Sequence, residues 1–399
     1  MKVALLLSEI DPKSGGGYTF QKDLFESLIQ CAEQTEHCFV LLHLSESPPI
    51  PLPKGNFQFL SLHRTVGERL ISKLQGLAAG AYGSTEWIDS RLREAGVDVI
   101  LNLRPDPISM ETPYINIVWD LQHRLQPFFP EVSSLGKWDK REANYTRWIQ
   151  RSVYTVVGTE TGKKQVMQLY GMLPERIRVL PLPTPSDVLN PATIRASDLI
   201  SKFNLPEKFL FYPAQFWPHK NHVNLLLALA HLRDKEQMTL PLALVGSDPG
   251  NNAHVSSMVE KLGLAKQVFS LGFVSRPELI ALYREAFMLC FVSYFGPDNI
   301  PPLEAFALGC PVLASDAMSE QLGDAALLVN PSDPRDIAAG IKRIAQEDSL
   351  RKSLLQRGAE RAQLFDRKDY ILGLFKLLEE FAPVLRNWSS QFVLLLPGR

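Results

Sequence analysis

The chain has 399 residues, which is enough for two domains of ordinary size. Hydrophobic residues make up 45% of it and charged residues 21%, as is typical of a soluble globular protein. With 42 basic and 43 acidic residues the formal net charge is −1, so the composition gives no support to a general nucleic-acid binder.

Neither terminal region is typical of a targeting or membrane-spanning segment. The apolar run at residues 3–7 is too short for a signal peptide and is followed by Glu9 and Asp11. The apolar tail at residues 392–396 is far too short to cross a membrane. The four cysteines form no Cys-x-x-Cys pair, which indicates reduced thiols rather than a zinc or disulfide framework. We therefore expect a cytoplasmic protein.

Apolar runs alternate with helical patterns along the first half of the chain. The expected strands are residues 2–7, 39–44, 97–102, 115–119 and 153–158. The expected helices include residues 19–32 and 163–170. The stretch 159–162 precedes the second helix and is interpreted as its N-terminal cap, with Glu160 and Thr161 facing a cleft.

A second series of the same kind begins after a Pro-rich linker at residues 181–185 and a polar run that reaches residue 201. Its expected strands are residues 209–212, 242–245, 268–271, 288–292, 312–314 and 326–329. Its expected helices are residues 221–233, 277–286, 302–308, 334–346 and 370–385. Two such series predict an α/β protein with two Rossmann-like domains facing a central cleft.

Three glycines, Gly15, Gly16 and Gly17, follow the first strand and precede a helix. A glycine loop at this place either turns tightly or cradles a phosphate. It lacks the spacing of a dinucleotide fingerprint and of a P-loop lysine motif. The sequence alone leaves a turn and a binding site equally open.

Polar residues also follow another strand of the first half. Asp120 and His123 come after the strand at 115–119, where sites of α/β proteins lie. Of the two we favour His123 as the residue that contacts a substrate. The alternative is that His123 has a structural role.

A loop after the strand at 209–212 carries Gln215, His219, Lys220 and His222. Lys220 stands just before a helix, where a lysine can neutralise a departing diphosphate. The alternative is a solvated surface lysine. Gly246 follows the strand at 242–245, and Phe273 and Val274 follow the strand at 268–271, which predicts further loops at the same cleft edge.

The stretch 295–304 reads as a tight loop that leads into a helix. Gly296, Asp298 and Asn299 are turn residues, and prolines occupy the first turn of the helix. A helix N-terminus at the carboxyl end of a strand suits an anionic or hydroxyl-rich ligand. Glu304 lies where its carboxylate could accept hydrogen bonds from a vicinal diol such as a ribose, or stabilise the helix dipole.

This stretch resembles the donor-binding signature of the retaining GT-B glycosyltransferases of family 4, also called glycosyltransferase group 1. The resemblance covers nearly the whole C-terminal half and parts of the N-terminal half. That family places two glutamates around a Gly-Pro-rich loop. Glu304 matches the second, which holds the ribose, and Leu303 lies beside it. Gly296 stands where the family has its first glutamate, so the contacts to the donor sugar are expected from Asp298, Asn299 and the backbone near Ile300.

The resemblance implies further roles. Lys220 matches a diphosphate-binding lysine, but the family's arginine is replaced by Gln215, and Trp119 replaces a histidine that contacts the donor sugar. Main-chain groups near Phe273, Val274 and Gly246 are expected to receive the nucleotide base. The glycine loop would lie beside the donor phosphates and the acceptor.

The same resemblance implies a domain plan. Residues 1–185 would bind the acceptor, residues 186–380 would bind the nucleotide sugar, and residues 381–399 would pack back on the first domain. The expected activity is transfer of a hexose from a UDP-sugar, with UDP-glucose as the first candidate. The acceptor would be a saccharide or a lipid-linked saccharide in polysaccharide synthesis. No cofactor is expected, and without an Asp-x-Asp motif no metal is expected.

Two other functions stay open. A nucleotide-sugar epimerase of the same build would need acids in the cleft. A nucleotide-binding protein that has lost turnover would explain the departures at Trp119, Gln215 and Gly296. The segment 64–77 and the basic-aromatic run 137–151 each allow two interpretations. Either could contact the inner face of an anionic membrane, or could be a surface helix with a solvated face.

Overall fold

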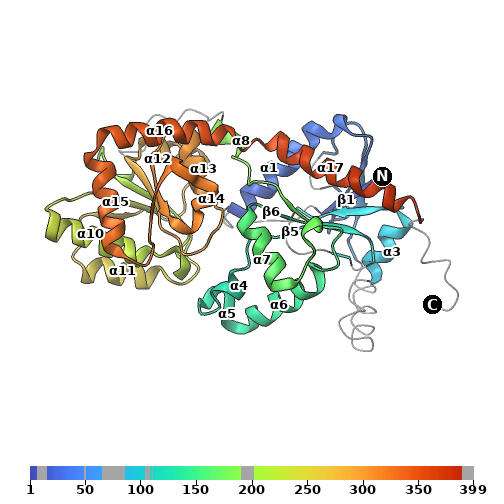
Figure 1. Ribbon diagram of the computed structural model, residues 1–399, viewed down its shortest axis with the longest axis horizontal. Helices are drawn as coiled ribbons and strands as arrows, with labels where there is room; N and C mark the ends of the chain where they lie inside the picture. Colours follow the sequence, from blue (N-terminus) through green and yellow to red (C-terminus); the bar gives the residue numbers. More distant parts are fainter. Residues whose placement is uncertain are drawn as a thin grey trace.

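A computed structural model of the chain describes residues 1–6, 16–48, 51–64, 86–103, 108–109, 111–189 and 202–388. The described residues form two α/β domains joined side by side (Figure 1). Some predictions fall wholly or partly outside the described ranges: Gly15, the end of the strand at 2–7, the segment 64–77 beyond Arg64, the polar linker from 190 to 201, and residues 389–399 of the C-terminal segment, which include the tail 392–396.

The N-terminal domain is built on a parallel sheet of seven strands in the order β3-β2-β1-β4-β5-β6-β7 among the described residues. The strands are β1 (Lys2–Leu6), β2 (Cys38–His43), β3 (Phe57–Ser61), β4 (Val99–Leu101), β5 (Tyr114–Ile117), β6 (Tyr154–Val157) and β7 (Ile177–Val179). Those at the centre are buried on both faces, as helix crossovers in a parallel sheet require.

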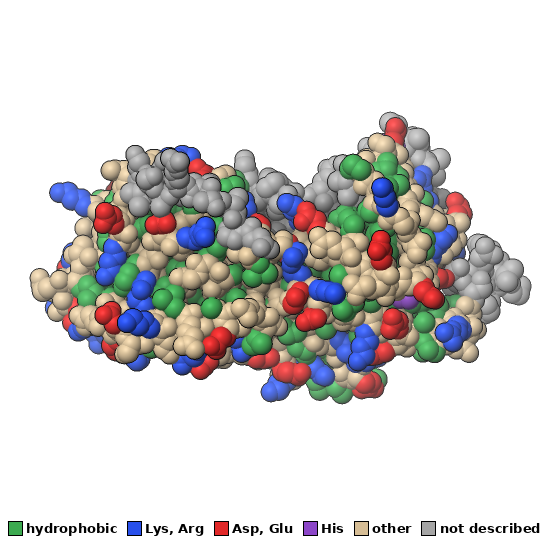
Figure 2. Space-filling model, turned by 90° about the horizontal axis from the view of Figure 1, so that it is seen from above, with side chains coloured by type: hydrophobic (Ala, Val, Ile, Leu, Met, Phe, Trp, Pro, Cys, Tyr) green, Lys and Arg blue, Asp and Glu red, His purple; other side chains and the backbone are tan. Residues whose placement is uncertain are grey.

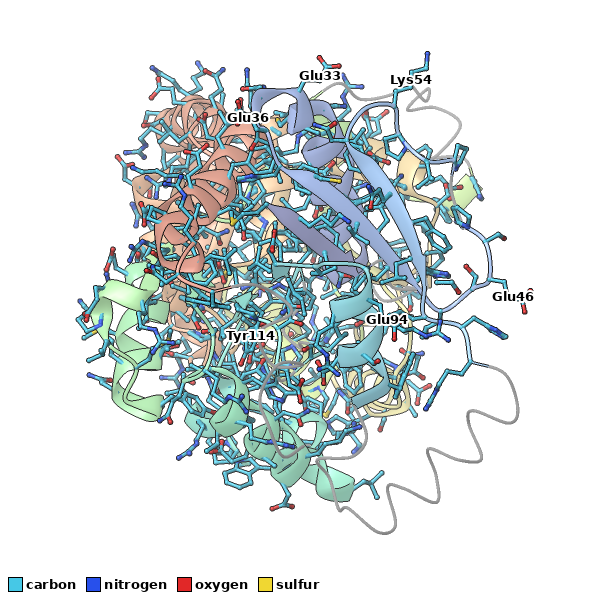
Figure 3. The ribbon with its side chains drawn as sticks, turned by 90° about the vertical axis from the view of Figure 1, so that its right-hand side faces the viewer. Glu33, Glu36, Glu46, Lys54, Glu94 and Tyr114 are labelled. Atoms are coloured by element: carbon cyan, nitrogen blue, oxygen red, sulfur yellow. The ribbon has the colours of Figure 1, made fainter. Side chains whose placement is uncertain are left out.

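Helices cover both faces of this sheet. They are α1 (Gly16–Cys31), α3 (Glu86–Glu94), α4 (Gln122–Leu125), α5 (Pro130–Ser133), α6 (Lys137–Trp148) and α7 (Glu160–Tyr170), with short 3-10 turns at Ala32–Gln34, Ser134–Gly136 and Pro174–Arg176. Figure 3 looks onto the outer end of this domain and shows Glu33, Glu36 and Lys54 at its edge.

The C-terminal domain repeats the plan with a parallel sheet in the order β10-β9-β8-β11-β12-β13. Its strands are β8 (Leu210–Pro213), β9 (Leu242–Val245), β10 (Val268–Ser270), β11 (Met288–Phe291), β12 (Val312–Ser315) and β13 (Ala326–Val329). Its helices are α10 (His222–Glu236), α11 (Asn252–Lys261), α12 (Arg276–Glu285), α13 (Ile300–Ala307), α14 (Ser319–Leu322), α15 (Pro334–Gln346) and α16 (Asp348–Gln363), with short 3-10 turns at Pro218–Lys220, Asp316–Met318 and Gly323–Ala325.

The chain crosses between the domains twice, at one place. The first crossing leads into α8 (Ser186–Leu189), and the second joins α16 to α17 (Arg367–Leu385). The two crossings are hydrogen-bonded, because Thr184 N donates to Phe365 O at 3.0 Å and Thr184 Oγ1 donates to Ala362 O at 3.0 Å. Thr184 is fully buried, so this pairing is a fixed point between the domains.

The last helix, α17, lies along the N-terminal domain (Figure 1). Its buried side chains, among them Ile371, Leu374 and Leu378, join the core formed by α1 and the first sheet. The crossing back therefore begins at Arg367, earlier in the chain than the boundary at residue 381 that the sequence suggested. No helix in the described part of the chain combines the length and apolar character needed to cross a bilayer.

The expected strands are all present, each within two residues of its predicted limits. Two strands were missed. β3 lies at the edge of the sheet with a half-exposed pattern, and β7 has only 3 residues, so neither gives a strong hydrophobic period. Charged side chains of both signs are interspersed on the face that Figure 2 shows, in keeping with a net charge of −1.

Replacing Leu374 with alanine should destabilise the N-terminal domain by about 2–5 kcal/mol, because the side chain is fully buried between α17 and the first sheet. Leu364→Ala is the matched control, since Leu364 is 68% exposed just before the crossing. Calorimetric unfolding of both variants checks the packing. Equal effects of the two substitutions would contradict the position of α17.

Candidate active site

A cavity of about 790 Å³ lies between the two domains. Its wall is formed by the loops at the carboxyl ends of β5, β6, β8, β9, β10 and β11, together with α1, α12 and α13. Residues predicted from the sequence that line it are Asp120, Gln215, Lys220, Gly246, Phe273, Val274, Gly296, Asp298, Asn299, Ile300 and Glu304. The fold therefore brings loops from both halves of the chain to one concave site.

The loop before α13 is tightly packed. A Cβ at Gly296 would lie 2.8 Å from the carbonyl oxygen of Ala317, so a side chain at this position requires the backbone to shift. Across the cavity, the side-chain amide of Gln122 donates to Gly296 O at 2.9 Å. Asn299 N donates to Gln321 Oε1 at 2.9 Å, which fixes the entry to the helix. The absence of a glutamate at position 296 thus follows from local packing.

Glu304 is nearly buried, with its side chain 5% exposed, and it lines the cavity from the second turn of α13. Its two oxygens accept different protein donors. Arg276 Nη1 lies 2.6 Å from Oε1, and the Tyr283 hydroxyl donates to Oε2 at 2.7 Å. The carboxylate is therefore held in one orientation, as a hydrogen-bond acceptor for a ligand must be.

Lys220 ends the 3-10 turn Pro218–Lys220 at the mouth of β8, and its ammonium lies 5.0 Å from the centre of the Phe291 ring. Burial lowers the pKa of Lys220 to about 8, while the carboxylates of Asp120 and Glu131 partly oppose that shift. Lys22 pairs with Glu26 in the same wall. Lys220 also lines the cavity, and within the described part of the chain it forms no ion pair of this kind with a carboxylate.

The loop that carries Lys220 is locked to the other domain. His219 Nδ1 lies 2.5 Å from Glu131 Oε1 of α5, and the backbone N–H of His219 donates to the same oxygen at 2.9 Å. The His219 ring stacks on Phe295 with 3.9 Å between centroids. Burial lowers the pKa of His219 to about 4, against the effect of the carboxylate. The imidazole is therefore neutral at physiological pH. Its contacts hold the Lys220 loop in place, and it adds no positive charge.

Gln215 stands where the resemblance implies an arginine, and its side chain carries no charge. Gln215 Nε2 donates to Ser247 Oγ at 2.7 Å, and the indole N–H of Trp217 donates to Gln215 Oε1 at 2.9 Å. Phe273 stands at the cavity wall with 53% of its surface exposed, whereas Val274 is buried. These loops offer a flat apolar ring and main-chain groups, which suits a planar base.

Asp298 and Asp120 face each other from the two domains. The carboxylate of Asp298 inserts against Gly158 at the end of β6, where a Cβ would lie 1.8 Å from Oδ2. Burial raises the pKa of Asp298 to about 7, and the Asp120 carboxylate adds to the shift. Asp120 is held by Arg141 Nη2, 2.9 Å away. Asp298 can therefore exchange a proton near neutral pH.

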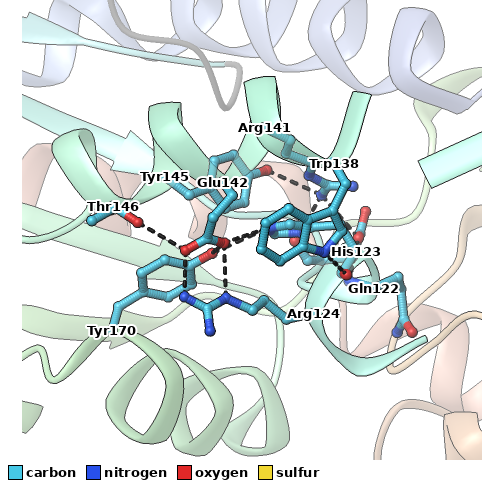
Figure 4. Close-up of polar contacts among 10 residues, drawn as sticks. Gln122, His123, Arg124, Trp138, Arg141, Glu142, Tyr145, Thr146 and Tyr170 are labelled. Atoms are coloured by element: carbon cyan, nitrogen blue, oxygen red, sulfur yellow. Dashed lines mark hydrogen bonds and ion pairs between the residues drawn. The ribbon is translucent and has the colours of Figure 1, made fainter. Parts of the chain in front are cut away.

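The structure corrects the interpretation of His123. Its side chain is fully buried outside the cavity wall, and Nε2 lies 3.1 Å from the Tyr170 hydroxyl and 3.2 Å from Glu142 (Figure 4). Burial lowers its pKa to about 4. Its carbonyl oxygen accepts from the Trp138 indole at 2.6 Å. His123 thus belongs to the packing of α4 on α6 and α7.

Other predicted positions also lie differently. The side chain of Leu303 is fully buried in the core and does not line the cavity. Gly16 and Gly17 are the first residues of α1 rather than a loop before it. Thr159 caps α7 as expected, through Gly162 N at 3.0 Å, but Glu160 N and Thr161 N donate to Glu320 of the C-terminal domain at 2.5 and 2.9 Å.

Sequence reasoning missed several cavity residues. Arg276 and Asp187 bind each other, and Tyr283 holds Glu304. Trp119, which the sequence already marked as a departure from the family pattern, lines the cavity wall with its ring centroid 6.0 Å from that of Phe20. Arg276 follows a capping serine and resembles an ordinary first-turn residue. The one available signal was its place a few residues after the strand expected at 268–271.

Comparison with known proteins identifies the class. Residues 195–361 match the family described as Glycosyl transferases group 1. O-antigen chain mannosyltransferase B of Escherichia coli is 26% identical over 259 residues, which cover 61% of this chain and 68% of that protein. The serotype-specific mannosyltransferase WbdA of the same organism is 24% identical over 260 residues, 62% of this chain but only 32% of its own length.

A solved structure agrees over the whole fold. HepE of Anabaena, crystallised with UDP and glucose, has a TM-score of 0.68 and 16% identity, covering 95% of this chain and 100% of that one. The fold is accordingly GT-B. The region that matches the group 1 glycosyl transferases, residues 195–361, lies in the C-terminal half of the chain.

Asp298 should make stability depend on pH. Because its folded pKa, about 7, is raised above the ordinary value of 3.8, its contribution is full below about pH 4 and is lost as pH rises to about 7. Asp298→Asn should flatten that decline, measured by urea unfolding from pH 4 to pH 8. Asp324→Asn, with a side chain 80% exposed, is the control and should follow the wild-type profile. An unchanged profile for Asp298→Asn would contradict its burial.

Proposed function

We propose that the protein transfers a hexose from a nucleoside diphosphate hexose to an acceptor hydroxyl, with retention of the anomeric configuration. The observation that carries this proposal is the cavity itself, where Glu304, Lys220 and Asp298 meet between two sheets. Glu304 accepts hydrogen bonds from the ribose, and Lys220 faces the diphosphate. Asp298 and Asn299 contact the donor sugar together with the N–H groups at the start of α13.

The reaction needs little from the protein beyond charge and position. The bond between the anomeric carbon and the diphosphate oxygen breaks, and the electron pair leaves with the diphosphate. The acceptor oxygen bonds to the same face of that carbon, and its proton passes to the departing phosphate oxygen. Lys220 stabilises the developing negative charge. The carboxyls of Asp120 and Asp298 bind hydroxyls of the sugars, and Trp119 closes the wall beside them.

The donor is a nucleoside diphosphate hexose with either of two sugars. UDP-glucose remains the prediction from the sequence, and HepE was crystallised with UDP and glucose. The two relatives described above are named mannosyltransferases, which favours mannose as the second candidate. The acceptor is a saccharide or lipid-linked saccharide of a polysaccharide pathway, handled on the cytoplasmic side.

Ligand-induced stabilisation checks the donor. Thermal unfolding with UDP, GDP and ADP, and with their glucose and mannose conjugates, should show one nucleotide series raising stability by roughly 2.7 kcal/mol at a hundred times its dissociation constant. Failure of all three nucleotides would remove the proposal. Binding without release of free nucleotide in the presence of saccharide acceptors would favour a protein that has lost turnover, and conversion of the bound sugar would favour an epimerase.

Lys220→Ala should lower kcat about 10²–10³-fold and change the dissociation constant of the donor far less, because charge develops on the leaving group only in the transition state. Lys220→Arg is the matched variant, since it retains the cation. Wild-type turnover should fall as pH rises through about 8, the pKa of Lys220, and that fall should move to higher pH in Lys220→Arg. Equal losses in kcat and affinity for Lys220→Ala would exclude the assigned role.

A further inference from the structure

The Arg276 guanidinium bridges two carboxylates at the cavity wall. Nε and Nη2 each lie 2.7 Å from an oxygen of Asp187, which is a bidentate contact, and Nη1 lies 2.6 Å from Glu304. Burial alone would lower the pKa of Arg276, but the two carboxylates raise it above its usual value. The cation is therefore permanently charged, and Nε, Nη1 and Nη2 each bond a carboxylate oxygen.

These contacts set the orientation of Glu304. Arg276 takes one oxygen of the carboxylate and Tyr283 takes the other, and each oxygen retains a lone pair for a further donor. A side chain that is 5% exposed has no water shell to orient it, so its plane depends on these two donors. A vicinal diol would meet an acceptor that is already in place.

The second partner of Arg276 comes from outside the matched domain. Asp187 lies in α8, the first element after the crossing from the N-terminal domain. Its neighbour Ser186 donates to Asp23 of α1, from Oγ at 2.6 Å and from N at 3.1 Å. Asp23 in turn lies 3.5 Å from Arg367, where the chain crosses back. Two sets of polar contacts, joined by the neighbours Ser186 and Asp187, thus connect Glu304 to the place where the chain crosses between the domains.

We propose that Arg276 is a positioning residue: it fixes the Glu304 carboxylate for a nucleoside ribose and ties that carboxylate, through Asp187, to the segment that joins the domains. This inference rests on the proposed function, since it takes the ribose as the ligand of Glu304. It assigns the strength of the ribose contact to a residue outside the donor-binding signature.

The geometry requires an arginine. A planar guanidinium reaches two carboxylates at once and presents parallel N–H groups to one of them, whereas a lysine ammonium is a single point of charge. Arg276→Lys should therefore hold the Glu304 carboxylate only in part. Arg276→Gln leaves Glu304 with the Tyr283 hydroxyl as its remaining donor and removes the link to Asp187.

The test compares each nucleotide with its 2′-deoxy analogue in the same protein, by calorimetric titration. UDP and 2′-deoxy-UDP are used, or the guanine pair if GDP binds the wild type more tightly. The wild type should prefer the ribonucleotide about 10-fold. In Arg276→Gln the preference should fall to less than about 2-fold, with Arg276→Lys between the two. The ratio is internal to each variant, so it is insensitive to a change in stability.

Two matched controls separate the proposed contacts from general effects of charge. Arg284→Gln removes an exposed arginine from the last turn of the same helix and should keep the wild-type preference. Asp187→Asn should lower the preference about 3-fold, and should have no further effect in the Arg276→Gln background. Asp234→Asn, which breaks an exposed Asp–Arg pair on α10, should change nothing.

The outcomes are distinct. A wild-type preference that survives in Arg276→Gln, or that falls equally in Arg284→Gln, would overturn the inference. Nucleotide binding without any preference for the ribonucleotide in the wild type would remove the ribose contact, and this inference with it, while leaving the proposed transferase intact. If the wild type binds no nucleoside diphosphate, the proposed function itself fails.

Discussion

The paired crossings at Thr184 and Phe365 are the constraint on which the site depends. Both sheets are parallel, so each presents the carboxyl ends of its strands at one edge, and a chain that passes twice through one buried point keeps these two edges opposite each other. The cavity is the space that remains between them. Polar contacts then hold the edges together, with Gln122 bound to Gly296 and His219 bound to Glu131.

The electrostatics of the cavity are unusual for a site that is proposed to bind a diphosphate. Carboxylates outnumber cations in its wall, Arg276 is taken by Asp187 and Glu304, and a neutral Gln215 occupies the place of an arginine. The positive potential available to a phosphate comes from Lys220 and from helix N-termini. A ligand in this site must therefore be held largely by hydrogen bonds to its hydroxyl groups, with a small number of charge contacts at the phosphates.

The sequence predicted the sheets and the loops that reach the cavity because both are local properties. Hydrophobic period, glycine stops and prolines in a first turn place the loops of Lys220 and Glu304 correctly. The roles of side chains inside those loops were less predictable. His123 follows a strand just as Asp120 does, but the direction of its side chain depends on packing against α6 and α7. Arg276 acquires its partners from residues 89 and 28 positions away in the chain, which no local pattern encodes.

The contact between Gly158 and Asp298 has a consequence for protein engineering. The carboxylate of one domain occupies the volume that any larger residue would need in the other, so the two positions form one steric unit that spans separate folding modules. A chimera that joins this N-terminal domain to the donor domain of a relative must carry a compatible pair at these positions. Exchange of domains in this protein must therefore preserve this contact together with the hydrogen bonds that link the two domains.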